Sequence, residues 1–448
     1  MEFQETHMKS ILKISLSFYL ATASIWGSES SIDTAGNWPQ WRGPDANGVA
    51  TKSDPPVSWS ETENIKWKVE LPGKGSSSPI VWGKYVFVTS AVPTGKTPEN
   101  PKPASTEGRG RSVPVSEQKF VVIALNREDG SILWQKSVRQ EVPHEGTHPT
   151  GTWASNSAVT DGQHIYAYFG SRGLYCLDFD GNLIWEKDFG EMTKIRAFGE
   201  GSSPALHADR VFVLWDHEGP SFLFALDKMT GNEIWKKSRD EGTSWSTPLV
   251  VETESGKQVI TSATNRARSY SFADGSLIWE CGGLTRNVIP SPVAEDGIVF
   301  LMSGFRGNAL FAVRLADAQG NVDGTESILW TASQDTPYAP SPLLYNEILY
   351  FLKSNNGILS AFGAKTGERF YGPQRLEGIG NVYSSPVGAA GRVYISDREG
   401  KTLVIRHGPE FEILASNALD DGFDASPAIV ADQIFMRGHQ SLYCIARK

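Results

Sequence analysis

Residues 204–236 read PALHADRVFVLWDHEGPSFLFALDKMTGNEIWK, and this stretch decides the fold. Runs of β-branched and aromatic residues alternate with short polar or glycine-containing turns, which is typical of consecutive short strands. In the last turn, Asp227 can bond its own backbone and Gly231 can adopt a positive φ. The stretch therefore predicts four strands, at residues 204–206, 210–215, 222–227 and 233–236.

The same phrase recurs along the chain. After the first copy its spacing is about 41–50 residues, the length of one four-stranded β-propeller blade. The first interval is longer because it contains residues 92–118, a polar, proline-rich insert that we expect to be a mobile loop. The copies begin at Ser77-Ser78-Pro79 and are then marked by Ser157, Pro204, Pro248, Pro292, Pro342, Pro386 and Pro427.

Most copies end on an aromatic residue close behind the turn glycine. An outer-strand tryptophan at a fixed register can cover the neighbouring blade, while its indole N–H still needs a partner. The alternative is that each ring fills only its own blade, but the recurrence favours the role between blades. The expected blade anchors are Trp67, Trp134, Trp185, Trp235, Tyr371 in place of tryptophan in the sixth copy, Trp279 and Trp330.

The two ends of the repeat array complete each other. The eighth copy stops after its third strand, whereas residues 65–69 form a fourth-strand phrase with no strands before it. Donating this strand to the last blade closes the ring and hides two sheet edges. We therefore predict an all-β fold over residues 38–448, an eight-bladed β-propeller of four-stranded antiparallel blades closed by an N-terminal strand.

The N-terminal residues look like an export signal. Lys9 and Lys13 precede a short apolar run, and Ala21-Thr22-Ala23 is a cleavage-site pattern. We expect a signal peptide at residues 1–23, with Met8 as the possible start, a linker at 24–37 and a periplasmic or secreted location. An uncleaved anchor is the alternative. No other segment is apolar enough to span a membrane.

Charge and cysteine content narrow the classes further. The net charge of -9 argues against nucleic-acid binding, which needs a basic surface. Cys176, Cys281 and Cys444 fall in different repeats, so we interpret them as buried packing residues. We expect a monomer.

These repeats resemble the pyrroloquinoline quinone (PQQ) repeat family over nearly all of residues 38–448. The S-x-P starts, the turns such as Leu226-Asp227…Gly231 and the Gly-x-x-x-Trp ends carry the resemblance, as do residues 37–44 and 160–170. One branch of the family comprises dehydrogenases that oxidise alcohols or sugars with PQQ and calcium. Another includes the scaffold lipoprotein of the outer-membrane β-barrel assembly machinery, which uses no cofactor.

Neither branch transfers directly. The chain lacks the adjacent cysteines and long roofing insertions of the alcohol-oxidising branch, and it lacks a lipid-attachment cysteine near the cleavage site. Because a repeat defines a fold rather than an activity, we carry two hypotheses. The first is a binding or scaffold module of the cell envelope with no cofactor. The alternative is a PQQ-dependent alcohol or sugar dehydrogenase.

Candidate ligand-binding residues lie in the loops expected at one face of the propeller. Cations in six of the turns between second and third strands could hold an anionic ligand, such as an acidic carbohydrate or an acidic protein partner. The alternative is that these charges are solvated or neutralised by nearby acids. Two tryptophans just before first strands are expected at the channel mouth. The candidates are Arg172, Arg266, Arg306, Lys353, Arg398, Arg437, Trp153 and Trp245.

Two segments invite a metal interpretation. His144-Glu145-x-x-His148 has zinc-motif spacing, but the surrounding prolines and glycines exclude the helix that the motif requires. Residues 321–326 resemble part of a calcium loop without its remaining ligands, so a lengthened hairpin is the simpler explanation. We predict no metal site.

Overall fold

The computed structural model of the chain describes residues 36–97 and 116–447. The expected signal peptide and nearly all of the linker lie outside the described residues, as does most of the insert at 92–118. The described part of that insert is more regular than predicted. The two strands that flank the insert pair with each other as far as Pro93 and Gln118, so the ends of the expected loop belong to a β-ladder.

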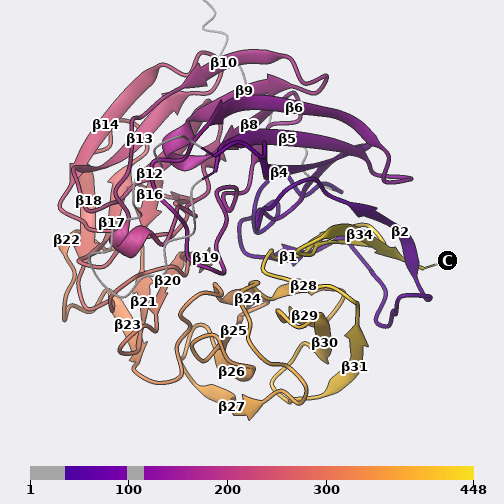
Figure 1. Ribbon diagram of the computed structural model, residues 1–448. Helices are drawn as coiled ribbons and strands as arrows, with labels where there is room; N and C mark the ends of the chain where they lie inside the picture. Colours follow the sequence, from indigo (N-terminus) through magenta and orange to yellow (C-terminus); the bar gives the residue numbers. More distant parts are fainter. Residues whose placement is uncertain (1–35, 98–115, 448) are drawn as a thin grey trace, which may run out of the picture. The chain divides into compact units, whose positions relative to one another are not determined.

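The described residues form eight antiparallel sheets arranged in a ring (Figure 1), which confirms the predicted all-β propeller. Within each blade the strands run from the centre outward. Blades 1 to 4 consist of β3 (Ile80–Trp82), β4 (Tyr85–Pro93), β5 (Gln118–Asn126) and β6 (Ile132–Glu141); β7 (Val159–Thr160), β8 (His164–Tyr168), β9 (Leu174–Asp178) and β10 (Leu183–Lys187); β11 (Ala205–His207), β12 (Arg210–Trp215), β13 (Ser221–Asp227) and β14 (Glu233–Arg239); and β15 (Leu249–Thr253), β16 (Gly256–Thr261), β17 (Ala267–Ser271) and β18 (Leu277–Cys281).

The second half of the ring repeats this plan. Blades 5 to 8 consist of β19 (Val293–Glu295), β20 (Ile298–Ser303), β21 (Ala309–Arg314) and β23 (Ile328–Ala332); β24 (Leu343–Tyr345), β25 (Ile348–Leu352), β26 (Ile358–Gly363) and β27 (Arg369–Arg375); β28 (Val387–Ala389), β29 (Arg392–Ser396), β30 (Lys401–Arg406) and β31 (Ile413–Ala418); and β32 (Ala428–Val430), β33 (Gln433–Arg437), β34 (Ser441–Ala446) and β2 (Ile65–Glu70). Two single turns of 3-10 helix, Gly170–Arg172 and Ile195–Ala197, lie in loops. The described residues contain no helix long and apolar enough to span a bilayer.

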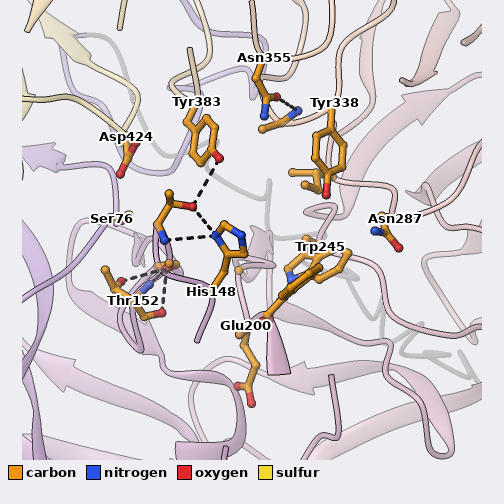
Figure 2. A pocket seen from close by; sticks show the side chains of 18 of the residues that line it. Ser76, His148, Thr152, Glu200, Trp245, Asn287, Tyr338, Asn355, Tyr383 and Asp424 are labelled. Atoms are coloured by element: carbon orange, nitrogen blue, oxygen red, sulfur yellow. Dashed lines mark hydrogen bonds between the residues drawn. The ribbon is translucent and has the colours of Figure 1, made fainter. Parts of the chain in front are cut away.

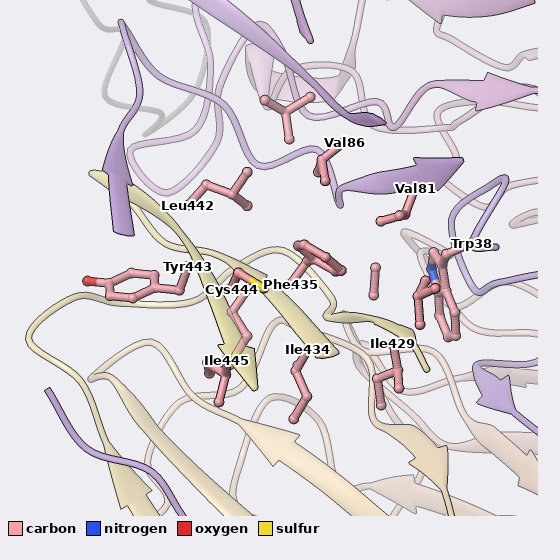
Figure 3. Packing of buried hydrophobic residues seen from close by; sticks show 14 of the residues in the cluster. Trp38, Val81, Val86, Ile429, Ile434, Phe435, Leu442, Tyr443, Cys444 and Ile445 are labelled. Carbon is pink, nitrogen blue, oxygen red and sulfur yellow. The ribbon is translucent and has the colours of Figure 1, made fainter. Parts of the chain in front are cut away.

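The last blade is closed by the N-terminal strand, as predicted. β2 pairs antiparallel with β34 and places Trp67 opposite Cys444, and the two strands lie side by side in Figure 1. The apolar core continues across this joint from Val81 and Val86 of blade 1 to Ile434 and Phe435 of blade 8 (Figure 3). Sheet pairing and buried side chains therefore join the two ends of the array.

The tryptophans make the contact between blades that their register predicts. Trp185 of blade 2 covers Gly231 in the turn of blade 3, where a Cβ atom would lie 2.6 Å from the ring and φ is +70°. Its indole N–H donates to the Lys228 carbonyl at 2.9 Å. Four others repeat this contact with the next blade: Trp67, Trp134, Trp235 and Trp330.

Trp279 is the exception among the tryptophans. It is fully buried, and its N–H donates to Gln258 of its own blade at 3.3 Å. The cause is the long hairpin of blade 5, whose short strand β22 (Gly320–Asn321) pairs parallel with β18. Val322 and neighbouring residues of that hairpin cover the indole, so this ring still contacts the next blade without the usual hydrogen bond.

A closed circle of hydrogen bonds joins the inner strands, a feature that the repeat pattern alone does not predict. In each copy the residue before the proline, or its equivalent, is a serine or threonine whose side-chain oxygen accepts the backbone N–H of its counterpart in the preceding blade. The N···O distances are 2.7–3.0 Å, and Ser426 bonds back to Ser78. We call these residues the hydroxyl ring: Ser78, Ser157, Ser203, Thr247, Ser291, Ser341, Ser385 and Ser426.

The segment before β2 crosses the inner strands. Trp38 bridges to Val81, and β1 (Val49–Ala50) adds a parallel strand to β28. Arg42 is buried and donates to the carbonyls of Pro342 and Pro386, both at 2.6 Å. Burial without a carboxylate partner lowers the pKa of this guanidinium to about 9. This segment, residues 38–50, is therefore an ordered part of the propeller that packs on the inner strands, and we call it the lead-in.

Candidate functional site

A cavity of about 530 Å³ opens at the loop face of the ring (Figure 2). Its walls come from the loops that lead into the first strands of the blades, with Phe305, Arg306 and Asn355 added from turns between second and third strands. A volume of this size falls within the range of about 300–1,000 Å³ typical of small-molecule sites. The cavity is therefore the candidate binding site.

The floor of the cavity is the hydroxyl ring. Six of its eight members line the cavity: Ser78, Ser157, Ser203, Thr247, Ser385 and Ser426. Trp41 of the lead-in also lines it, and its indole donates to Ser426 at 3.2 Å. Each ring oxygen accepts a backbone N–H, and its own hydrogen makes no hydrogen bond to any of the described residues, so that hydrogen is available to donate. The floor therefore presents hydrogen-bond donors.

Aromatic rings form much of the wall. Tyr338 stacks on Phe305 with ring centroids 4.7 Å apart, and Phe198 meets the His148 ring edge-on at 5.1 Å. Trp245 is held by a 2.8 Å hydrogen bond from its indole to the Gly199 carbonyl. These fixed rings give the cavity rigid apolar faces.

A buried lysine lies behind Trp245. The Lys194 ammonium is 5.5 Å from the centre of a Trp245 ring and donates to the carbonyls of Asp216 and Ser244 at 2.6 and 3.0 Å. Burial lowers the pKa of Lys194 to about 8, against the opposing attraction of Glu200 and other nearby acids. Lys194 is thus a positioning group for Trp245 rather than a cavity-lining charge.

Three arginines line the cavity with exposed side chains: Arg196, Arg286 and Arg306. Arg196 lies in the 3-10 turn Ile195–Ala197, and Arg306 lies over the Phe305 ring at 5.4 Å. None of the three forms an ion pair with any carboxylate of the described residues. Their charge is therefore directed to solvent or to a ligand.

The two carboxylates of the cavity are already engaged. Glu200 accepts the N–H and the hydroxyl of Ser171, both at 2.6 Å, and lies 3.4 Å from Arg172. Asp424 accepts hydrogen bonds from Arg398 and His439. Burial opposes ionisation of Asp424, but these hydrogen bonds outweigh it and lower the pKa of the carboxyl. Neither acid neutralises the three lining arginines.

The six cations expected to form a ring do not come together in one site. Only Arg306 lines the cavity. Arg172 pairs with Glu141 and Glu200, Arg266 with Glu280 and Asp323, Lys353 with Asp335, and Arg398 with Asp424. These four cations are therefore neutralised by nearby acids, which is the alternative that the sequence left open.

Arg437 differs from the other members of that set. It is buried between blades 8 and 1, where it donates to the Ser77 hydroxyl, the Thr89 carbonyl and the Ser90 hydroxyl. With no carboxylate beside it, burial lowers its pKa to about 9. Arg437 therefore ties the joint between the first and last blades and is inaccessible to a ligand.

Of the two tryptophans expected at the channel mouth, the structure places one in the cavity. Trp245 lines it, whereas Trp153 packs against the core of blades 1 and 2 and donates to the Glu145 carbonyl at 3.0 Å. The missed residues Arg196 and Arg286 lie in loops before first strands, which share no spacing between copies. No signal in the sequence separates them from other surface arginines.

The metal interpretations find no support in the geometry. His144 contacts Arg172 and the Met192 carbonyl, while His148 contacts Thr150, so the two histidines face different partners. Residues 321–326 belong to the long hairpin of blade 5, where Asp323 pairs with Arg266. The described residues hold no group of three or more His, Cys, Asp or Glu side chains that could bind a metal.

The cavity residues also fit a calcium-bound quinone poorly. Calcium takes six to eight oxygen ligands, carboxylates above all. Both cavity carboxylates are engaged by cationic donors, as described above. Cys176, Cys281 and Cys444 are buried in three different blades and form no disulfide. The cavity lining therefore does not supply the free carboxylates that such a group needs.

Fold and site together define an eight-bladed propeller of PQQ-type repeats with a donor-rich cavity on its axis. A sequence model of the family described as outer membrane protein assembly factor BamB matches residues 118–370 and 221–448. The chain belongs to this family. BamB of Yersinia pestis is 21% identical over 356 residues, which cover 76% of this chain and 83% of the relative.

Solved structures agree on the fold. BamB from Moraxella catarrhalis is 13% identical with a TM-score of 0.58, over 86% of this chain and 97% of that one. A europium-containing methanol dehydrogenase is 11% identical with a TM-score of 0.64, over 93% of this chain and 99% of that one. At these identities the likeness shows the propeller architecture and leaves the activity open.

Proposed function

We propose that the protein is a binding or scaffold module of the cell envelope, periplasmic or secreted, and that the loop-face cavity holds its ligand or partner. The observation that carries the proposal is the set of three lining arginines, which have no carboxylate partner among the described residues, above a floor of hydroxyl donors. Membership of the BamB family supports the envelope role, and the export-signal pattern supports the location.

The experiment titrates the purified protein with anilinonaphthalene sulfonate, an aromatic anion that fluoresces when it leaves water. We expect saturable one-to-one binding. Arg196→Gln with Arg286→Gln and Arg306→Gln should weaken it about 3–140-fold, because three exposed charge contacts contribute about 0.2–1 kcal/mol each. Arg406→Gln is the matched control, since Arg406 is exposed and pairs with Glu412 in blade 7, away from the cavity.

Circular dichroism on every variant guards against a partly unfolded protein, which also binds this dye. Equal dye affinity in the triple variant and the wild type would contradict the proposal.

The dehydrogenase hypothesis is tested separately by adding PQQ and calcium and following dye-linked oxidation of alcohols and sugars. We expect no turnover. Stoichiometric PQQ binding with activity would replace the binding function by an enzymatic one.

A further inference from the structure

We infer that the cavity binds an acidic oligosaccharide, a short sugar chain that carries carboxylates. This inference rests on the proposed function, because it names the ligand class of the same site. Three properties of the cavity carry it: its excess of hydrogen-bond donors, its fixed aromatic faces and its volume.

The excess of donors calls for a ligand rich in acceptors. Arg196, Arg286 and Arg306 present guanidinium groups, which donate but cannot accept. Asn355 uses its carbonyl oxygen to accept the Ala339 N–H at 3.0 Å, so its amide hydrogens are left to donate. The hydroxyl ring adds donors at the floor. Carboxylate and sugar oxygens match this pattern, and arginine binds carboxylates in a two-point geometry.

The same excess argues against an acidic peptide. A peptide brings one backbone N–H per residue, and each needs an acceptor when it leaves water. The cavity carboxylates Glu200 and Asp424 each already accept three hydrogen bonds, so few of their lone pairs remain for a peptide N–H. Sugar hydroxyls adapt to such a site because each can accept as well as donate.

The aromatic faces suit a ligand with both apolar and polar sides. A pyranose ring has a face of C–H groups that can lie flat on an aromatic ring while its hydroxyls point to polar neighbours. Trp245 is fixed by the Gly199 carbonyl, and Tyr338 is fixed by stacking on Phe305. These rings line the same cavity as the three arginines, so one ligand can meet both kinds of group.

The volume limits the length of the ligand. A cavity of about 530 Å³ accommodates a small-molecule-sized ligand, so it takes the end or a short stretch of a sugar chain.

The test displaces bound anilinonaphthalene sulfonate with four competitors: trigalacturonate, neutral maltotriose, hexaglutamate and citrate. We expect trigalacturonate to displace the dye at a concentration at least tenfold below that of the other three. Citrate controls for charge alone, and maltotriose controls for sugar rings alone. The direct affinity of trigalacturonate, measured by calorimetry, should fall at least tenfold in Trp245→Ala and in Arg286→Gln with Arg306→Gln, but not in Arg406→Gln.

Each other outcome is decisive. If hexaglutamate or citrate displaces the dye as well as trigalacturonate does, the sugar class is wrong while the anion-binding function stands. If the dye binds in an arginine-dependent way and trigalacturonate fails to displace it, the inference is likewise overturned alone. If the dye shows no arginine-dependent binding, the proposed function itself fails.

Discussion

Removing the Trp67 ring tests how the propeller is closed. Trp67 is 8% exposed, its N–H donates to the Arg127 carbonyl at 3.0 Å, and its ring lies 5.9 Å from Phe435. Truncating a buried tryptophan to alanine costs about 3–5 kcal/mol. Trp67→Phe keeps most of the apolar contact but loses the hydrogen bond. We therefore expect this variant to lose only about 0.5–1.5 kcal/mol of stability relative to the wild type.

The assay must suit the size of the chain. Unfolding entropy of about 2 cal/mol/K per residue sums to roughly 0.8 kcal/mol/K over the described residues, so Trp67→Ala should shift the melting temperature by only about 4–6 °C. Guanidinium unfolding, which reports free energy directly, is the better measurement. Trp330→Ala is the matched control, because Trp330 makes the same contact with Gly367 inside the ring.

We expect both alanine variants to be destabilised, but only Trp67→Ala to increase protease cleavage around β34, since only that change loosens the donated strand. If Trp67→Ala unfolds like the wild type while Trp330→Ala does not, the closure by β2 contributes nothing to stability and the reasoning is refuted.

Three further predictions concern buried polar contacts. Ser341→Ala leaves the Ser291 N–H without its acceptor and should lower the free energy of unfolding by about 1–3 kcal/mol, while the exposed Ser416→Ala should change it by less than about 0.5 kcal/mol in the same guanidinium titration. The folded protein loses the Lys194 proton as pH rises through about 8, whereas an unfolded lysine keeps its proton up to about pH 10.4. The free energy of unfolding should therefore rise between these two pH values. Lys194→Met should remove this rise when unfolding is measured over a series of pH values. Arg437→Met should lower the free energy of unfolding by roughly 3 kcal/mol, about 1 kcal/mol for each of its hydrogen bonds to the Ser77 hydroxyl, the Thr89 carbonyl and the Ser90 hydroxyl. A variant as stable as the wild type would contradict this account of the joint.

The fold could be predicted because its determinants are local and repeated. The turn at Asp227–Gly231 and the tryptophan behind it are legible in one stretch of sequence, and eight copies fix the number of blades. The unmatched strand phrase at residues 65–69 indicated the closure for the same reason. The hydroxyl ring is visible in the sequence only as a serine or threonine at one position of each copy, because its role arises when the eight copies face one another.

The site could be predicted only in part, because it depends on contacts between distant loops. Arg398 meets Asp424 in the next blade, and Arg266 meets Asp323 in the long hairpin, so whether a turn cation is free depends on residues many positions away. Arg306 looks the same in the sequence but has no such partner among the described residues. The charge pattern indicated cations on the loop face, but of the six candidates only Arg306 lines the cavity.

The salt dependence of dye binding tests the central claim most directly, because attraction between exposed charges is screened by salt. The claim is that Arg196, Arg286 and Arg306 supply the charge that attracts a ligand into the cavity. Between 50 mM and 500 mM sodium chloride, the affinity for anilinonaphthalene sulfonate should fall steeply in the wild type and in Arg406→Gln, and should stay nearly flat in the triple glutamine variant. Parallel salt dependences in all three proteins would contradict it.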